Sequence, residues 1–109
     1  MTESGVARPA AGATIEDVLS LRLYVAGDGP NSMEARANLA SILQAHPEAR
    51  YELEVVDFLK EPLRAMRDGV IVTPTLVRLA PPPERKLIGT LRETATVIAA
   101  LGIGEVRHG

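Results

Sequence analysis

The connection between two apolar stretches near the C-terminus constrains the fold more than any other feature of the sequence. Residues 75–80 (TLVRLA) and 85–89 (RKLIG) have the β-branched and apolar composition of strands, and only residues 81–84 (PPPE) join them. Parallel neighbours need a crossover of about a dozen residues or more, so a link this short requires an antiparallel pair. The sequence therefore predicts a terminal hairpin, with its three prolines as a rigid link.

The first half of the chain predicts two strand–helix units. In residues 20–27 (SLRLYVAG) apolar and polar residues alternate, which predicts a strand with one face in the core that stops at Gly27. Asn31 is expected to cap the first helix, with Glu34 three residues later. That helix is predicted to run to about residue 46. Residues 51–57 (YELEVVD) alternate again and predict a second strand.

Two further helices complete the predicted order. Pro62 suits the first turn of a short helix and Gly69 suits its C-terminal cap. Thr90 and Glu93 form a capping box for the last helix, which is predicted to end at Gly102. The resulting order is βαβαββα. Strand–helix–strand units place strands parallel through right-handed crossovers, and the hairpin completes a mixed four-stranded sheet. This α/β arrangement is the thioredoxin-like architecture.

The ends of the chain differ in composition from its middle. Residues 1–17 are rich in Ala, Gly, Ser and Thr and predict a flexible tail, while residues 18–104 form the predicted domain and residues 105–109 a short tail. No segment approaches the roughly 20 apolar residues of a membrane span, and the N-terminus does not resemble a signal peptide. We therefore expect a cytoplasmic protein without a membrane partner.

Composition and charge exclude several classes of function. The net charge is −2 and 3% of the residues are aromatic, so the sequence has neither a basic block nor stacking residues for nucleic acid. Cysteine is absent, which excludes disulfides, thiol catalysis and cysteine-based zinc sites. His46 lies at a predicted helix end and His108 among the last two residues, and we interpret each as a surface residue. We expect no catalytic residue, no metal and no cofactor.

The loop of residues 27–32 (GDGPNS) lies where thioredoxin-like proteins carry their chemistry. A redox enzyme needs a thiol at this helix N-terminus, and the loop has none. Its glycines could expose amides to an anion, but we interpret the loop as an ordinary turn and cap. Asp57 has the chemistry of a general base, but no nucleophile or metal spacing accompanies it. We interpret Asp57 as a turn residue, and no enzyme emerges from the sequence.

Four quoted segments resemble the circadian clock protein family KaiB. The segments are LRLYVAGDGPNSMEA, YELEVVDFLKEP, IVTPTLVRLAPPPERKLIG and the closing helix, and together they cover about residues 20–103. The positions that match the family pattern in order are Tyr24, Val25, Ala26, Gly27, Pro30, Asn31, Ser32, Asp57, Pro62, Thr73, Pro74, Thr75, Leu76, Pro81, Pro82, Pro83, Arg85, Ile88 and Gly89. A standalone KaiB-type protein fits the length of the chain better than the related sensor domain of a clock histidine kinase.

The resemblance implies a non-enzymatic regulatory protein in circadian-rhythm or stress signalling. The implied partners are a KaiC-like ATPase ring, a clock-type histidine kinase and further copies of the chain in a dimer or tetramer. It also implies fold switching between the thioredoxin-like state and a βαββααβ state, with the second half of the chain refolding. The residues expected to bind partners or to take part in the switch are Tyr24, Gly27, Asn31, Tyr51, Asp57, Pro74, Arg78, Arg85, Lys86, Ala100 and Gly102.

Several positions depart from the family pattern. Glu54 and Gly69 stand where family members usually have Lys, although Arg78, Arg85 and Lys86 are expected to keep positive charge near the docking surface. Ala100 replaces a common Gly, and Gly102 replaces a common Asp. Alanine favours a helix over glycine by up to about 1 kcal/mol. Our hypothesis is that this chain stays mainly in the thioredoxin-like state.

A second class of function stays open at the level of the sequence. Pro74 is expected to be the cis-proline of a thioredoxin-like sheet, although an edge-strand proline without a switching role is the simpler reading. A cysteine-free module of this fold could bind a peptide or a glutathione-like ligand between Pro74 and the first helix. Such binding would affect residues 27–32 and 73–75, whereas a regulator of the KaiB type would bind an ATPase ring.

Overall fold

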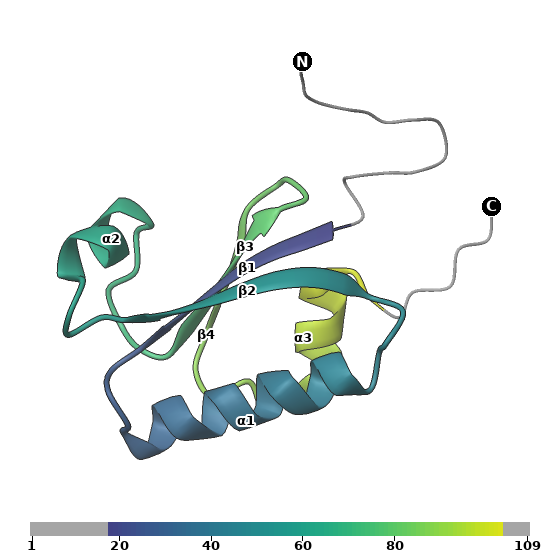
Figure 1. Ribbon diagram of the computed structural model, residues 1–109, viewed down its shortest axis with the longest axis horizontal. Coiled ribbons are helices and arrows are strands. Elements are labelled where there is room, and N and C mark those ends of the chain that lie inside the picture. Colours follow the sequence, from purple (N-terminus) through teal and green to yellow (C-terminus); the bar gives the residue numbers. More distant parts are fainter. Residues whose placement is uncertain (1–17, 104–109) are drawn as a thin grey trace.

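The computed structural model describes residues 18–103, and the predicted tails, His108 and the predicted domain end at residue 104 lie outside them. The elements are β1 (Val18–Val25), α1 (Pro30–Gln44), β2 (Arg50–Asp57), α2 (Pro62–Arg67), β3 (Thr75–Ala80), β4 (Arg85–Ile88) and α3 (Thr94–Leu101). This order, shown in Figure 1, confirms the predicted βαβαββα sequence of elements.

The four strands form one mixed sheet in the order β2-β1-β3-β4. β1 pairs with β2 in parallel, whereas the β1–β3 and β3–β4 pairs are antiparallel. The predicted hairpin is therefore confirmed, with Thr75 opposite Ile88 and Arg78 opposite Arg85. The Thr73–Pro74, Ala80–Pro81 and Pro82–Pro83 peptide bonds are cis. β2 and β4 are the two edges of the sheet.

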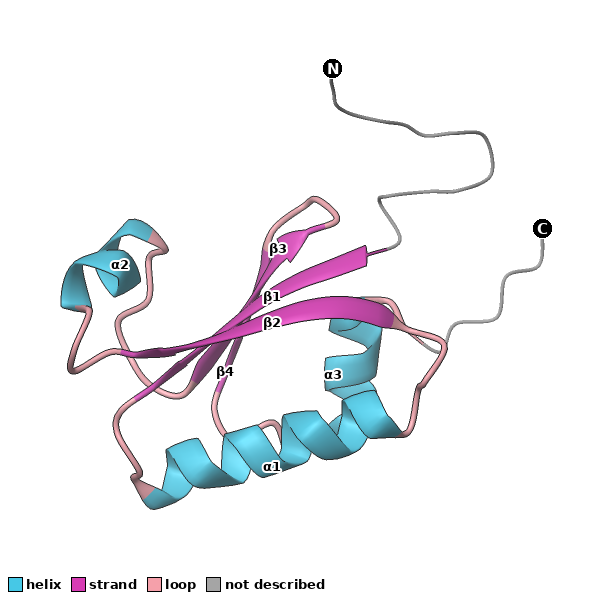
Figure 2. Cartoon of the chain, viewed as in Figure 1, coloured by secondary structure: helices cyan, strands magenta, loops and turns pink. Residues whose placement is uncertain are grey.

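The sheet is covered on both faces, but unequally. Alternate residues of β1, among them Leu21 and Leu23, pack with α1 and α3 in the larger apolar cluster. Figure 2 shows these two helices on one side of the sheet. Tyr24 points to the other face and packs with Ala65 of α2 in a smaller cluster. The first strand therefore has both faces in the core, whereas its alternation predicted only one.

Two helices begin later or differently than the capping signals predicted. The N-cap of α1 is Gly29 and Pro30 occupies the first turn, so Asn31 is not the cap. Proline suits this position because its fixed φ is helical and its missing N–H would be unpaired there anyway. The last helix begins at Thr94, without a Thr90–Glu93 capping box. Leu91 has a φ of 66°, outside the helical region, and its side chain is buried in the larger cluster.

Both shorter helices end as the sequence predicted, at glycines. Gly69 and Gly102 have φ values of 71° and 73°, in the left-handed region that favours glycine. After α2, the amide of Val70 donates to the carbonyl oxygen of Ala65, and both side chains lie in the smaller cluster. This pattern of a glycine followed by an apolar contact is a Schellman motif. No helix within residues 18–103 is long and apolar enough to span a membrane.

Candidate partner-binding surface

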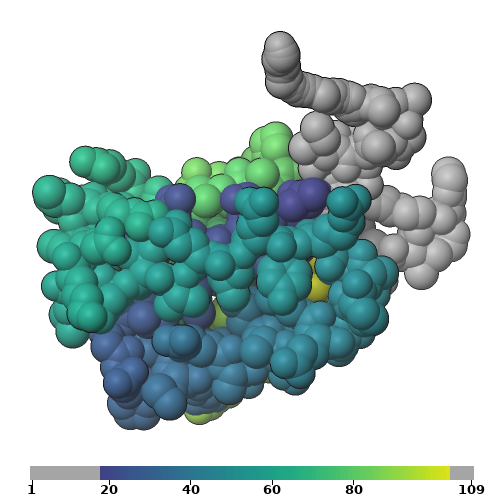
Figure 3. Space-filling model, in the orientation of Figure 1, coloured from purple at the N-terminus to yellow at the C-terminus, as the bar shows by residue number. Residues whose placement is uncertain are grey.

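The segment around α2 exposes an unusual number of large apolar side chains. Its exposed members, which we call the lobe surface, are Leu59, Leu63, Met66, Ile71 and Val72, with exposed fractions of 70%, 64%, 70%, 84% and 44%. They come from one segment that projects at the left of Figure 3, at one end of the molecule. Within α2 itself only Ala65 is buried. Exposed apolar clusters of this kind are typical of interaction surfaces.

Positive charge lies near the lobe surface. Lys60 and Arg67 are exposed within the same segment. From the neighbouring hairpin, Lys86 reaches toward it, because a Cβ at Gly69 would lie 3.5 Å from Lys86 Nζ. Lys86 Nζ is also 3.3 Å from a carboxylate oxygen of Glu84. An apolar centre with cations beside it suits a partner surface that carries acidic residues.

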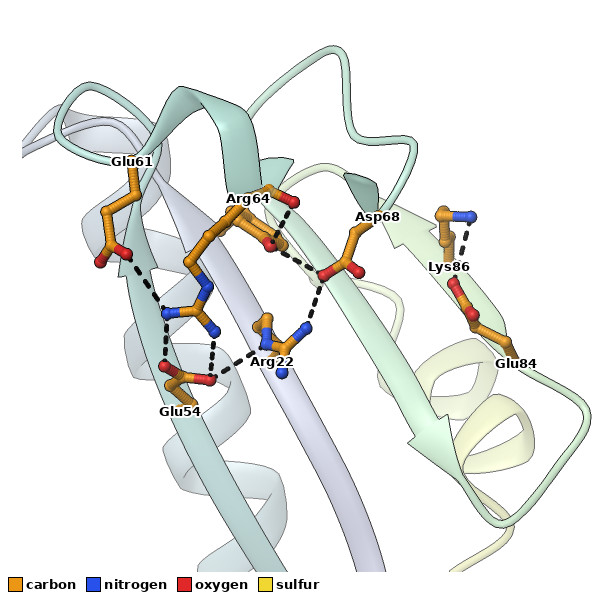
Figure 4. A network of polar contacts seen from close by, with 8 residues as sticks. Arg22, Glu54, Glu61, Arg64, Asp68, Glu84 and Lys86 are labelled. Carbon is orange, nitrogen blue, oxygen red and sulfur yellow. Dashed lines mark hydrogen bonds and ion pairs between the residues drawn. The ribbon is translucent and has the colours of Figure 1, made fainter. Parts of the chain in front are cut away.

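A network of ion pairs joins α2 to the sheet (Figure 4). The two Nη atoms of Arg64 each lie 2.7 Å from a different carboxylate oxygen of Glu54 on β2. Arg22 on β1 connects Glu54, at 3.0 Å, with Asp68 after α2, at 2.8 Å. Charges of alternating sign therefore join β2 and β1 to the middle of α2 and to the turn that follows it.

Tyr24 adds a buried hydroxyl to this network. Its oxygen lies 2.7 Å from Asp68 Oδ2 and 3.0 Å from the carbonyl oxygen of Arg64, and both are acceptors for its single proton. Burial and the neighbouring Asp68 raise the pKa of Tyr24 to about 12. The bonds from Arg22 and Tyr24 outweigh burial and lower the pKa of Asp68. Asp68 is therefore a charged acceptor and Tyr24 a neutral donor near pH 7.

Glu54 is the most strongly perturbed acid of the network. The bidentate bond from Arg64, with a smaller contribution from Arg22, lowers its pKa to about 2. In the sequence, Glu54 stands where family members usually have Lys, and nothing there indicates an ion pair. Its partner Arg64 was not singled out, because sequence spacing does not show that position 64 meets position 54. The sequence does contain one signal for the lobe surface. Two large apolar residues, Leu63 and Met66, lie three residues apart just after the helix-starting Pro62.

Two predicted site residues, Asp57 and Gly27, meet at the start of this segment. Asp57 Oδ1 accepts hydrogen bonds from the amides of Gly27, at 3.2 Å, and Leu59, at 2.9 Å. Asp57 therefore joins the β1–α1 loop to the turn after β2, as expected of a turn residue. Asn31 is exposed in the first turn of α1, and Pro74 is buried at the start of β3. Tyr51 is exposed on the edge strand β2.

Arg78 does not present its charge on a surface, and this corrects the expectation from the sequence. Only 8% of Arg78 is exposed. Its two Nη atoms donate to the carbonyl oxygens of Ala100, at 2.8 Å, and Pro83, at 2.7 Å. Burial lowers its pKa, with a smaller effect from Arg85. Of the predicted basic residues, only Arg85 and Lys86 are exposed.

No group of three or more histidine, aspartate and glutamate side chains within residues 18–103 is arranged to hold a metal ion. An open cavity of about 320 Å³ lies between β4 and α3, lined by residues that include Leu87, Leu91 and Val97. None of the predicted site residues lines this cavity, and it does not include Pro74 or the β1–α1 loop.

Comparison with known proteins identifies the family. The KaiB domain model matches residues 22–103. The chain belongs to the KaiB family. A relative in Prochlorococcus marinus, named circadian clock oscillator protein KaiB, is 45% identical over 76% of this chain and 71% of its own length. A relative of the same name in Nostoc punctiforme is also 45% identical, over 76% of this chain and 80% of its own.

Solved structures show the fold of this KaiB family member. The N-terminal domain of Synechococcus elongatus SasA aligns with a TM-score of 0.68 at 21% identity, over 92% of this chain and 99% of that domain. The thioredoxin Deadhead of Drosophila melanogaster aligns with a TM-score of 0.62 at 19% identity, over 77% of this chain and 80% of its own. The thioredoxin-like architecture predicted for this KaiB chain is confirmed.

Proposed function

We propose that this KaiB family member is a non-enzymatic regulatory protein that docks on a KaiC-like ATPase ring in circadian-rhythm or stress signalling. The lobe surface carries the proposal, because it places five large apolar side chains in solvent around a helix with one buried residue. Family membership supports the choice of partner. The absence of cysteine supports a binding role, because a thioredoxin-like redox enzyme needs a thiol.

Further partners belong to the same proposal. A clock-type histidine kinase would compete for the ring if its sensor domain shares this fold and docks through the same face. Self-association into a dimer or tetramer and a switch to the βαββααβ fold are part of the proposal, and family membership supports them. We propose that the thioredoxin-like form dominates, because Gly102 ends α3 in a conformation that an Asp adopts less readily.

The test of ring docking uses one exposed residue of the lobe surface. Met66→Glu should weaken ATP-dependent co-elution with a purified KaiC-type ATPase by about tenfold or more, because a carboxylate would be buried in an apolar contact. Met66 is 70% exposed, so the fold should be retained. Met33→Glu is the matched control, because Met33 is 52% exposed on α1, which covers the opposite face of the sheet. Equal binding by wild type and Met66→Glu, or equal loss in both variants, would contradict the proposed docking face.

A peptide or glutathione-like ligand near Pro74 is the alternative function. It predicts saturable chemical-shift changes confined to residues 27–32 and 73–75 when glutathione is added. If those shifts occur and no RecA-type ATPase is recovered from the native lysate, the alternative replaces the ring-docking proposal.

A further inference from the structure

α2 has little apolar packing to keep it on the sheet. It spans Pro62–Arg67, and an isolated helix of this length is unstable in water. Its single buried residue is Ala65, whose methyl group removes little apolar area from water. Val70 and the partly buried Phe58 add contacts on either side of α2. They belong to the segment of residues 58–72, which we call the lobe. Leu63 and Met66 point into solvent, so they do not help to attach the helix.

Charged groups supply a second attachment to the sheet at two points. Arg64 is bidentate with Glu54 of β2, which is the strong and orientation-specific form of a carboxylate bond. Asp68 Oδ2 accepts hydrogen bonds from both Arg22 and Tyr24 of β1. Glu61 lies 3.4 Å from Arg64 at the start of the helix. One strand therefore contacts the middle of α2 and the other contacts the turn that follows it.

The exposure of these groups determines how the network should respond to its surroundings. The side chains of Arg22 and Asp68 are 24% and 16% exposed, whereas those of Arg64 and Glu54 are 29% and 48% exposed. A single exposed ion pair contributes about 0–1 kcal/mol, but a bidentate pair within a network is the case in which charges do contribute. Salt screens exposed pairs more than it screens buried ones.

We propose that the Arg22–Glu54–Arg64–Asp68 network is an electrostatic clamp that fixes α2, and with it the lobe surface, more by charge than by packing. The clamp makes Glu54, Arg64 and Arg22 positioning residues for a docking surface to which they contribute no apolar contact. Its effect on partner binding rests on the proposed function, but its effect on the lobe does not. Rising ionic strength should loosen α2 before it loosens the rest of the sheet.

Native-state hydrogen exchange on the full chain tests the clamp without a partner. Glu54→Gln should raise exchange of the amides of Asp68, Gly69 and Val70 by about fivefold, the factor that the upper end of an exposed pair provides. Amides of β1 and β3 should keep their protection. Glu34→Gln is the matched control, because it breaks an ion pair with Arg92 between α1 and the segment before α3, on the opposite face of the sheet. Unchanged exchange in the lobe, or an equal rise throughout the sheet, would overturn the proposal.

A double-mutant cycle and a salt titration complete the test. The pair Glu54→Gln and Arg64→Gln should be non-additive, with the double variant exchanging no faster than the worse single variant. In about 1 M salt, where the Debye length is about 3 Å, wild-type lobe amides should approach the rate of Glu54→Gln. Two results would exclude a clamp. One is additive effects of the two substitutions on amide exchange, and the other is a rise in exchange with salt that is as large in Glu54→Gln as in wild type.

Ring binding separates this inference from the proposed function. Both proposals hold if three results are obtained. Met66→Glu no longer binds the ATPase, the lobe amides of Glu54→Gln exchange faster than in wild type, and Glu54→Gln binds the ATPase several-fold more weakly. If no variant and no wild-type protein binds a ring but the exchange result is obtained, the clamp holds and the proposed function fails. If Glu54→Gln binds like wild type despite faster exchange, the positioning role is wrong.

Discussion

Arg78 shows how far the environment of one residue can depart from its sequence context. The residue lies between Val77 and Leu79 in a strand, and nothing in that stretch indicates where its charge is satisfied. The acceptors come from the hairpin loop and from the C-terminal end of α3, where carbonyl groups carry partial negative charge. Arg78 Nε is buried and has no acceptor among residues 18–103. Its position therefore depends on the two Nη bonds.

Arg78→Lys should destabilise the protein although the charge is kept. A lysine ammonium is a point donor on a flexible stem and cannot span both carbonyl groups, so one buried acceptor loses its partner. We expect the free energy of unfolding to fall by about 1–2 kcal/mol. Urea unfolding followed by circular dichroism measures this change. Arg85→Lys, at an exposed position on the paired strand, should stay within about 0.5 kcal/mol of wild type, and equal effects would contradict the role of Arg78.

At the scale of elements, the ends of helices distinguish what could be predicted from what could not. Strands and the hairpin followed from alternation and from the short proline link, both of which are local. The predicted N-cap of α1, Asn31, was wrong. Pro30 already occupies the first turn, because its fixed φ is helical. Leu91 fits the helical spacing, yet its side chain reaches the core from outside the helix. Such choices depend on contacts between distant segments.

The glycine that ends α3 gives a prediction for this element. Gly102 has a φ of 73°, so Gly102→Ala should cost about 1 kcal/mol of unfolding free energy, because a Cβ disfavours this conformation. Gly102→Asn should cost less, because asparagine tolerates the left-handed region better. Thermal unfolding of the three proteins gives the order. Equal stability of the alanine and asparagine variants would show that φ is not the cause.

At the scale of the whole molecule, charge and apolar packing stabilise different faces of the sheet. The face under α1 and α3 contains the larger apolar cluster, whereas the face under α2 combines a small cluster with the ion network. The first agrees with a composition in which 46% of residues are apolar. The second depends on Glu54, Arg64 and Asp68 meeting across the fold, so sequence patterns did not reveal it. The lobe surface was missed for the same reason.

The pH dependence of the free energy of unfolding should reveal the contribution of the ion network. The pKa of Glu54 falls from its ordinary 4.5 to about 2 on folding, so its contribution is fully present above pH 4.5 and is lost as the pH falls toward 2. Glu54→Gln should therefore cost about 1 kcal/mol at pH 7 and progressively less below pH 4.5. Urea midpoints across pH 2–7 measure the difference. Glu84→Gln is the control, and a constant difference between Glu54→Gln and wild type at all pH values would contradict the assignment.

The buried guanidinium of Arg78 also links the behaviour of two segments. Its bonds reach residues 5 and 22 positions away in the sequence, one in the hairpin loop and one in α3. If α3 left the sheet alone, a positive charge would remain in the interior with one acceptor fewer, and solvent would have to enter to compensate. Opening of the C-terminal segment should therefore be cooperative. We expect the loop and α3 to open as one foldon, so that partly opened states are rarely populated.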